Sequence, residues 1–436
     1  MSTPGRSASG ALFPVRGAAV VWLLLACGVA LSPLSSKIAG VVWLLFSGWG
    51  IFLVLRGRRA GAPVAGAGLP AARCWLLACA VFTVLGGAVL WYWSDPFDGM
   101  NAELRLLIAA VATWGVLARG AALPRHFRAG SGFALAGSCL VALLCIVGVL
   151  ALYPNPRDNL PANAIVWAMG AGFALCLLLP LVLDGDAPAG WRRWWLGAVV
   201  LGVAAVLLSQ SRGAMGVFAW MLWLVVERWR RRRGHWPLAR MGALLLAVVA
   251  VVAALWAAPG DPLRLRQAEH EVVRAEDNGR FDTSMGTRVY LWHLARDGIV
   301  SSPWIGIGGA ERLRRIKHAG DELPEAQRAG LWYVRLMGHV HNQYLHSALD
   351  GGMVGLASIL ALMAGMAGVA WRLRRVDPLA SRQMQGLLFV HATGCVTNVN
   401  FAHNYYVLAL GMGVTLVLLG AAQRGTTGAV APASRP

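Results

Sequence analysis

Residues 338–355 read GHVHNQYLHSALDGGMVG and bring three histidines and an asparagine to the start of a hydrophobic segment. A histidine in this position could bind a metal, accept a proton or cap a helix. His339 and His341 supply at most two metal ligands, and no neighbouring set of cysteine, histidine or carboxylate completes a tetrahedral site. A helix starting near Asn342 disfavours charged imidazole, so we expect neutral histidines that can accept a proton. His346, deeper in the segment, is expected to be a packed, hydrogen-bonded core histidine.

Two arginines at other hydrophobic boundaries are candidates for binding an anion. Arg212 follows Ser211 in the sequence SQSRGAMG, at the end of a predicted membrane span. An ionisable residue at that depth needs a partner, an aqueous cavity or an anionic ligand. Arg288 falls on one face of a predicted amphipathic helix that Thr283 or Ser284 can cap. For both arginines the alternative is an ordinary interfacial side chain that reaches the lipid headgroups.

The other polar residues of these segments are expected to have simpler roles. The arginines of ERLRRIK (311–317) are predicted to lie on a solvated or headgroup-facing surface. Asp350 is expected to pair with a buried polar group, and NFAHNYY (400–406) to cap a helix first and form a site second. A helix-packing seam, and not a phosphate loop, is predicted for Gly351, Gly352 and Gly355.

The composition is that of a membrane protein. Of the 436 residues, 57% are hydrophobic and 14% are charged, whereas a soluble domain carries about 25% charged residues. The net charge of +19 comes from clusters between the hydrophobic runs, the pattern of the positive-inside rule, so nucleic-acid binding is not expected. All seven cysteines lie in hydrophobic runs and are expected to be core residues, neither disulfides nor ligands.

We predict an all-α, polytopic integral membrane protein with about twelve transmembrane helices. Basic and acidic-to-neutral loops alternate, which puts both termini in the cytoplasm and a large loop in the periplasm. The aromatic, glycine-punctuated pattern of that loop predicts a functional segment with interfacial amphipathic helices. The predicted divisions are nine helices in 1–257, the loop in 258–340, three helices in 341–422 and a cytoplasmic tail in 423–436. The predicted spans are 17–33, 37–55, 71–92, 103–118, 132–152, 161–183, 192–208, 213–228, 238–257, 342–371, 383–399 and 404–422.

One combination of motifs is more specific than its parts. An S-R-G turn is followed by a large loop with TRVYLW and SPWIGIGG, and then by HVHNQYLHSALDGGMVG. Over roughly residues 200–360 this chain resembles the family of O-antigen ligases and O-antigen polymerases. The family pattern is H-N, nine residues and G-x-x-G, with two important arginines before it. These positions are occupied here by His341, Asn342, Gly352, Gly355, Arg212 and Arg288.

The resemblance implies a metal-independent GT-C-type glycosyltransferase of the bacterial inner membrane, with no cofactor and a periplasmic active site. Its donor would be a glycan on undecaprenyl pyrophosphate, and its acceptor a lipid A-core sugar, giving lipopolysaccharide. Arg212 and Arg288 would bind the pyrophosphate, and a histidine would be the general base. The spacing of His339 and His341 leaves open which of them takes the proton. Supporting roles would fall to Ser211, Asn342, Gly352 and Gly355.

Three other functions remain as alternatives. An O-antigen polymerase uses a lipid-linked acceptor as well as a lipid-linked donor, and a protein O-oligosaccharyltransferase transfers to serine or threonine. A lipid-linked glycan flippase or secondary transporter belongs to a different class and would place charges near the bilayer midplane. Here the polar residues gather at the outer boundary, which favours an enzyme.

Overall fold

The computed structural model describes residues 15–56, 68–95, 100–119, 126–152, 164–184, 190–233 and 265–427, together with residues 123, 188 and 257. This part of the chain is helical and contains no β-strand, in agreement with the predicted all-α class. Seven of its helices are long and apolar enough to cross a membrane. They are α2 (Ser36–Leu55), α3 (Gly68–Trp93), α4 (Asn101–Ala118), α5 (Phe127–Leu152), α6 (Ala164–Asp184), α15 (Gln343–Val376) and α17 (Asn404–Thr427).

Four further predicted spans form helices that fall below this length or hydropathy. Two are only 17 residues long, one ends in the basic run ERWRRRR, and one carries the polar residues Ser381, Arg382 and Gln383 in its first two turns. The span predicted at 238–257 lies outside the described residues, apart from residue 257. The total of about twelve spans therefore stays a prediction. The four helices are α1 (Val15–Leu31), α7 (Arg192–Leu208), α8 (Gly216–Arg233) and α16 (Pro378–Thr397).

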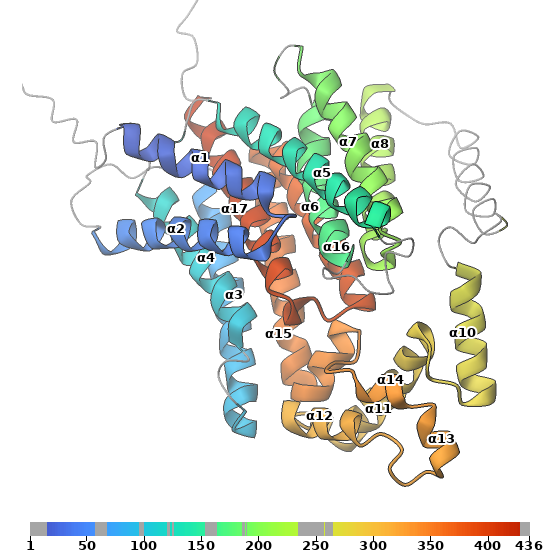
Figure 1. The fold of residues 1–436 in the computed structure, drawn as a ribbon. Coiled ribbons are helices and arrows are strands. Elements are labelled where there is room, and N and C mark those ends of the chain that lie inside the picture. The colour runs from blue at the N-terminus through green and yellow to red at the C-terminus, as the bar shows by residue number, and fades with distance from the viewer. Residues whose placement is uncertain are drawn as a thin grey trace, which may run out of the picture.

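The hydrophobic helices pack into a bundle around α6 and α17 (Figure 1). In these two helices 83% and 89% of the most apolar window is buried, against 22% in α3 and 28% in α5. Helices hydrophobic on every side belong either in a core or against lipid. The bundle therefore has α6 and α17 inside and leaves apolar faces of α3 and α5 for the acyl chains.

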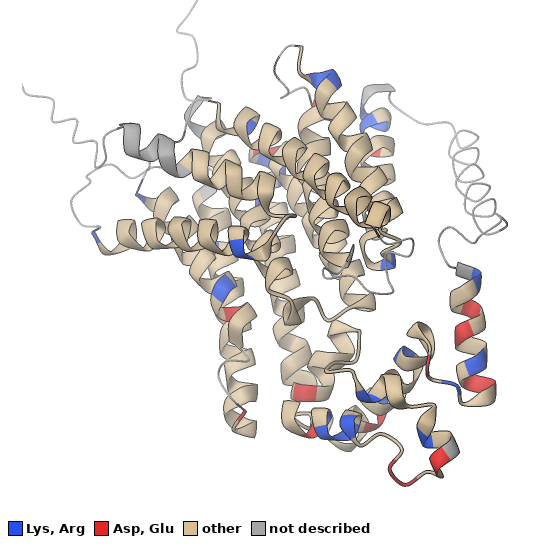
Figure 2. Cartoon of the chain, viewed as in Figure 1, with Lys and Arg blue, Asp and Glu red and all other residues tan. Residues whose placement is uncertain are grey.

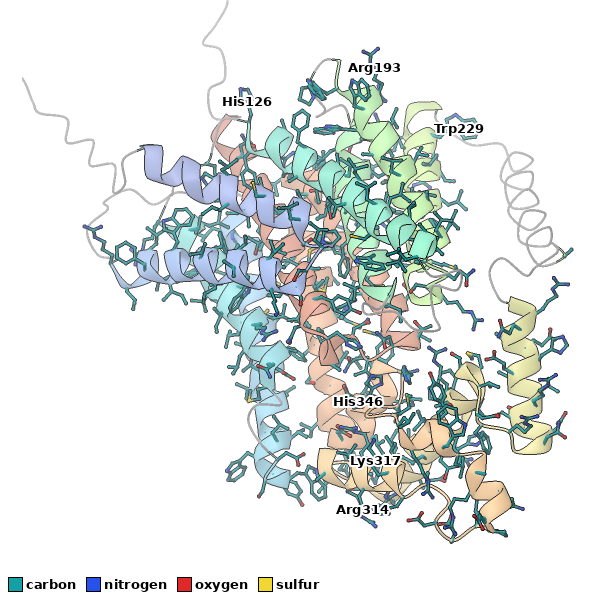
Figure 3. The ribbon with its side chains drawn as sticks, viewed as in Figure 1. His126, Arg193, Trp229, Arg314, Lys317 and His346 are labelled. Carbon is teal, nitrogen blue, oxygen red and sulfur yellow. The ribbon has the colours of Figure 1, made fainter. Side chains whose placement is uncertain are left out.

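Charged residues lie at the two ends of the bundle, while its middle is almost free of them (Figure 2). His126 and Arg193, from two loops predicted to share one side, lie at one end. His346, Arg314 and Lys317 lie at the other (Figure 3). The residues of the predicted basic loops and those of the predicted large loop thus lie at opposite ends of the bundle. Which end faces the cytoplasm remains a prediction of the positive-inside rule.

Residues 265–340 form a compact helical region at the end of the bundle where α3 and the start of α15 protrude (Figure 1). It has a hydrophobic core of its own, in which Leu291, Ile316 and Val334 are completely buried together with Leu349 of α15. The predicted loop thus contains helices, while its place at the membrane interface stays a prediction. Its helices are α10 (Leu265–Asn278), α11 (Ser284–Ser301), α12 (Gly309–Lys317), α13 (Glu325–Ala329) and α14 (Trp332–Arg335).

Local capping signals fix where the two site-bearing helices begin. Thr283 has extended backbone angles, and its hydroxyl accepts a hydrogen bond from Gly286 N at 3.0 Å, so it caps α11. Asn342 caps α15, with its side-chain oxygen accepting from Tyr344 N at 3.0 Å and from Leu345 N at 3.1 Å. Such caps satisfy amides that a helix start leaves without partners. Both starts agree with the sequence predictions.

α15 is not the continuous helix that the sequence predicted for 342–371. Gly352 has φ +58° and ψ −146°, which breaks the helix after less than three turns. The freed backbone groups bond instead to a turn-containing, non-helical segment at 303–308. Ile307 N donates to Leu349 O (2.8 Å), Gly308 N donates to Asp350 O (3.0 Å), and Met353 N donates to Pro303 O (2.9 Å). The SPWIGIGG motif therefore serves as a backbone cradle for the broken helix.

This break corrects the predicted glycine seam. Gly351 does pack closely on another helix, against Val89 of α3. Gly352 instead adopts the left-handed backbone, with the backbone of Trp304 and Ile305 where a Cβ would stand, and Gly355 lies against the carbonyl of Ser347. The H-N-x9-G-x-x-G pattern thus encodes a capped short helix and its interruption.

Replacing Gly352 by alanine should destabilise the protein, because an L-residue at φ +58° costs about 1–2 kcal/mol and the cradle leaves no room for a Cβ. We expect the melting temperature in detergent to fall by several degrees. The matched control is Gly148→Ala in α5, an exposed helical glycine where an added Cβ would have no atom within 4 Å, so that melting should hold or rise. Equal melting temperatures for the two variants would contradict the cradle.

Candidate active site

Arg212 and Arg288 are brought together in one small cavity. Arg212 begins the 3-10 turn η2 (Arg212–Ala214) that joins α7 to α8, and Arg288 lies in the first turns of α11. The two side chains line a cavity of about 120 Å³ whose described lining contains no carboxylate. We call it the arginine cavity; it is also lined by Ile165, Met169, Ser211, Gly213, Met285, Trp292, Gly394, Thr397, Asn398 and Asn400.

Close packing of η2 on α16 sets the position of Arg212. Where Gly213 and Gly216 would carry a Cβ, the hydroxyls of Thr397 and Thr393 already lie. Ser211 is buried, and its backbone N–H donates to Ser209 Oγ at 3.1 Å. Small residues let a backbone approach a helix this closely.

The environment of Arg288 is unfavourable for a cation in the absence of a ligand. Burial, and next the charge of Arg212, lower the pKa of Arg288, while Tyr333 and Glu271 act in the opposite direction. Its Nε atom is buried and makes no hydrogen bond to the described residues. Two guanidinium groups held close in a partly buried cavity form a site suited to an anion.

The predicted histidines lie in a short turn, residues 338–342, which we call the histidine turn. The rings of His339 and His341 meet edge to face with centroids 4.3 Å apart, and His403 lies 5.9 Å from His339. The turn is held on one side by Trp292 of α11, whose Nε1 donates to Val340 O at 3.1 Å. His341 has φ +54°, a conformation that costs energy in a non-glycine residue and is often found at functional sites.

Both histidines are neutral at pH 7. Burial is the largest cause, and it lowers the pKa of His339 to about 4 and that of His341 to about 2. The second cause is His346 for His339 and the neighbouring ring of His339 for His341, and Arg288 also acts on His341. The neutral state agrees with the prediction, although burial and nearby cations replace the helix start as its main reason.

His403 is a member of this cluster that the sequence assigned first to a helix cap. It follows the 3-10 turn η3 (Asn400–Ala402), and its ring stacks on Tyr405 with centroids 5.4 Å apart. Burial lowers the pKa of His403 as well. The only signal in the sequence was the second H-N pair at an outer boundary, because 62 residues separate His403 from His341 along the chain.

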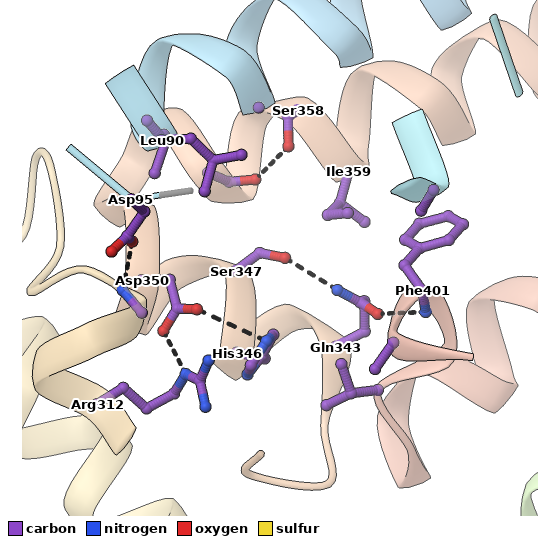
Figure 4. A pocket seen from close by; sticks show the side chains of 18 of the residues that line it. Leu90, Asp95, Arg312, Gln343, His346, Ser347, Asp350, Ser358, Ile359 and Phe401 are labelled. Atoms are coloured by element: carbon purple, nitrogen blue, oxygen red, sulfur yellow. Dashed lines mark hydrogen bonds and ion pairs between the residues drawn. The ribbon is translucent and has the colours of Figure 1, made fainter. Parts of the chain in front are cut away.

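A second and larger cavity, of about 460 Å³, lies between α3, α4, α12 and α15 (Figure 4). In it Arg312 Nε donates to Asp350 Oδ1 at 2.7 Å, and His346 Nε2 lies 3.6 Å from Asp350 Oδ2. We call it the α3–α15 cavity. Its other polar lining side chains are Asp95, Glu103, Gln343, Ser347 and Ser358.

This cavity corrects two predictions and confirms one. His346 is not simply packed in a core: it lines the cavity, and its Nδ1 is buried without a hydrogen bond to the described residues. The solvated position predicted for the arginines of ERLRRIK is wrong for Arg312, because its side chain pairs with Asp350 and is only 13% exposed. Asp350 does have the buried polar partner that was expected. Arg314 and Arg315 remain outside, paired with Glu311.

Arg312 also connects the α3–α15 cavity to the histidine turn. Its Nη1 donates to the carbonyl oxygen of Gly338, while its Nε holds Asp350. Among the described residues, no three histidine, cysteine, aspartate or glutamate side chains are grouped so that they could hold a metal ion.

The arginine pair, the histidine turn and the break in α15 all lie in the one segment of the chain that is similar to a known protein family. Residues 197–360 match the O-antigen ligase family, Wzy_C. The match confirms the resemblance found in the motifs, and it indicates ligase- or polymerase-type transfer of a glycan at a membrane. It spans Ser211, Arg212, Arg288 and the whole histidine turn. No curated protein matches the chain.

The lowered pKa values of the histidines predict how stability depends on pH. The unfolded chain binds protons below an imidazole pKa of about 6.5, whereas folded His339 and His341 stay neutral down to about pH 4 and 2. Stability is therefore lost as the pH falls below 6.5. We expect His341→Gln to lose fewer degrees of melting temperature than wild type between pH 7.5 and pH 5.

The control for this experiment is His293→Gln, at an exposed position of α11. Its melting temperature should fall between pH 7.5 and pH 5 by as much as that of wild type. If His341→Gln and His293→Gln both follow the wild-type curve, then burial of neutral imidazole does not contribute to the acid sensitivity.

Proposed function

We propose that the protein is an O-antigen ligase of the bacterial inner membrane, with a periplasmic active site and both termini in the cytoplasm. Its donor is O-antigen polysaccharide on undecaprenyl pyrophosphate, and its acceptor is a sugar of the lipid A core. One observation carries the proposal: two arginines share a cavity without a lining carboxylate, beside two neutral histidines. The family match over residues 197–360 supports the same class of reaction.

The reaction is an inverting displacement of the GT-C type. The acceptor hydroxyl oxygen attacks the anomeric carbon of the donor, and the bond from that carbon to the phosphate oxygen breaks. The pyrophosphate leaves with the electron pair, and Arg212 and Arg288 stabilise the charge that develops on it. The hydroxyl proton passes to His339 or His341 as general base. Asn342 supports the turn by capping α15, and Ser211 supports the position of Arg212.

A bound pyrophosphate also explains why histidines with such low pKa values can act as a base. Without the donor, the cation Arg288 is one of the groups that lower the pKa of His341. An anion in the arginine cavity offsets that charge and raises the imidazole pKa toward the working pH, where a general base is most effective. The donor thus activates the base.

Arginine substitutions test the anion site. Arg212→Ala and Arg288→Ala should each lower transfer by about 100-fold or more, the usual effect of removing a donor to a developing negative charge. The matched control is Arg296→Ala, two turns along α11 at an exposed position, which should stay within about twofold of wild type. Transfer would be measured with purified donor and rough lipopolysaccharide. If Arg296→Ala lost activity while Arg212→Ala and Arg288→Ala kept it, the assignment of the anion site to Arg212 and Arg288 would be rejected.

Gene deletion separates the ligase from its alternatives. Lipid-linked O-antigen should still be made, but the lipid A core should lack the ladder seen on a lipopolysaccharide gel. One repeat unit left on the core would identify a polymerase, and loss of glycan from secreted proteins would identify a protein glycosyltransferase. Lipid-linked glycan that fails to cross the membrane would identify a transporter.

We also propose that the transfer needs no metal ion. Activity of the purified protein should survive EDTA, because the arginines supply the positive charge that a metal would otherwise bring to the leaving group. Loss of activity in EDTA that zinc or magnesium restores would refute this.

A further inference from the structure

The two cavities beside the histidine turn have opposite electrostatic character. The arginine cavity is lined by two guanidinium groups and no described carboxylate. The α3–α15 cavity is lined by three carboxylates, Asp95, Glu103 and Asp350, and by one arginine that already pairs with Asp350. Like charges in a partly buried space repel strongly. A pyrophosphate therefore suits the first cavity better than the second.

The lining of the α3–α15 cavity matches an uncharged, hydroxyl-rich molecule. Carboxylate and amide oxygens accept hydrogen bonds from hydroxyl groups, and the Ser347 hydroxyl can donate as well as accept. The apolar side chains of Val89, Leu90 and Phe401 line the same space and can contact the C–H faces of a sugar ring. With a volume of about 460 Å³, the cavity is large enough for one or two sugar rings.

Several of these polar groups are already fixed in place. Gly309 N donates to Asp95 Oδ2 at 3.0 Å, and Gln343 Nε2 donates to Ser347 Oγ at 3.1 Å. Two atoms of lining residues, His346 Nδ1 and Glu103 Oε2, are buried and make no hydrogen bond to the described residues. Buried polar atoms without a partner are costly in a folded protein. A ligand with hydroxyl groups would satisfy them.

We propose that the α3–α15 cavity binds the acceptor as an uncharged sugar, while the donor pyrophosphate occupies the arginine cavity. This inference rests on the proposed transferase function. Arg312 is the positioning residue of the arrangement, because it holds Asp350 in the cavity wall and the Gly338 carbonyl of the histidine turn at the same time. Its charge also acts on His339. One lining residue of each cavity thus bonds to the histidine turn: Arg312 to Gly338 O from the α3–α15 cavity, and Trp292 to Val340 O from the arginine cavity.

Filling the cavity from its rim gives the cleanest experiment. Ala310 of α12 lines the cavity and is exposed, so Ala310→Trp should narrow the entrance without disturbing a packed core. With purified undecaprenyl-pyrophosphate-linked O-antigen and rough lipopolysaccharide, the KM for lipopolysaccharide should rise at least about tenfold. The KM for the donor should stay within about twofold. The matched control is Ala329→Trp, an exposed alanine of α13 that does not line this cavity.

A second variant tests the polar lining. Asp350→Asn keeps the shape of the side chain but removes the charge that Arg312 pairs with, so the KM for lipopolysaccharide should again rise while the donor KM is unchanged. Asp297→Asn, exposed on α11, is its control. A melting curve of each variant shows whether a loss of activity comes from unfolding. If Asp350→Asn unfolds, the result for Ala310→Trp decides the outcome.

The results separate this inference from the proposed function. If wild type transfers no glycan to lipopolysaccharide, the proposed function fails, and retention of rough lipopolysaccharide on the immobilised protein still tests the cavity. Retention lost in Ala310→Trp and kept in Ala329→Trp supports an acceptor site. A donor KM that rises in Ala310→Trp with an unchanged lipopolysaccharide KM overturns it, and so does a variant with wild-type values for both.

Discussion

The arrangement of this protein depends on the backbone hydrogen bonds between the 303–308 segment and the broken start of α15. Ile307 and Gly308 donate to carbonyls that the break at Gly352 leaves without helical partners, and Trp93 of α3 donates to Ile305 O at 2.9 Å. This contact fixes where α12 begins. From that position Arg312 reaches both Asp350 and the histidine turn. The helices α3, α12 and α15, which are distant in the sequence, are thereby held in a fixed arrangement.

The same region accumulates features that stability alone would not favour. Two arginines are close together, three imidazoles are clustered, and His341 has a left-handed backbone. Each of these costs free energy, and the surrounding packing of Leu291, Val334 and Leu349 compensates for it. Violations of local rules tend to collect where a protein binds or reacts. Here they collect at the arginine cavity and the histidine turn.

Local signals in the sequence were sufficient to predict the positions and starts of many of the helices. Thr283 and Asn342 are capping residues, and both cap the helices expected of them. Hydrophobic runs located the helices because burial in lipid or in a core follows composition directly. Arg212 and Arg288 could be proposed together only through the family pattern, since no local rule relates two residues 76 positions apart. Their shared cavity is a property of the fold.

What the sequence could not predict depends on long-range contacts. Gly352 lies in a hydrophobic run that suits a continuous helix, and only the cradle from 303–308 reveals why it is left-handed. Arg312 looked like its exposed neighbours Arg314 and Arg315 until the fold brought Asp350 to it across 38 positions. His403 likewise joins the other histidines only because η3 folds back over the start of α15, where Phe401 N donates to Gln343 Oε1 at 3.0 Å.

The small core of residues 265–340 has a consequence for how the protein is made. Leu349 is a completely buried member of that core, yet it belongs to α15, which is synthesised after the whole loop. The core therefore cannot close until Leu349 and α15 have been synthesised. Its hydrophobic residues stay exposed until the ribosome has delivered the next span. Insertion of α15 is then the step that completes both the membrane bundle and the extramembrane region at once.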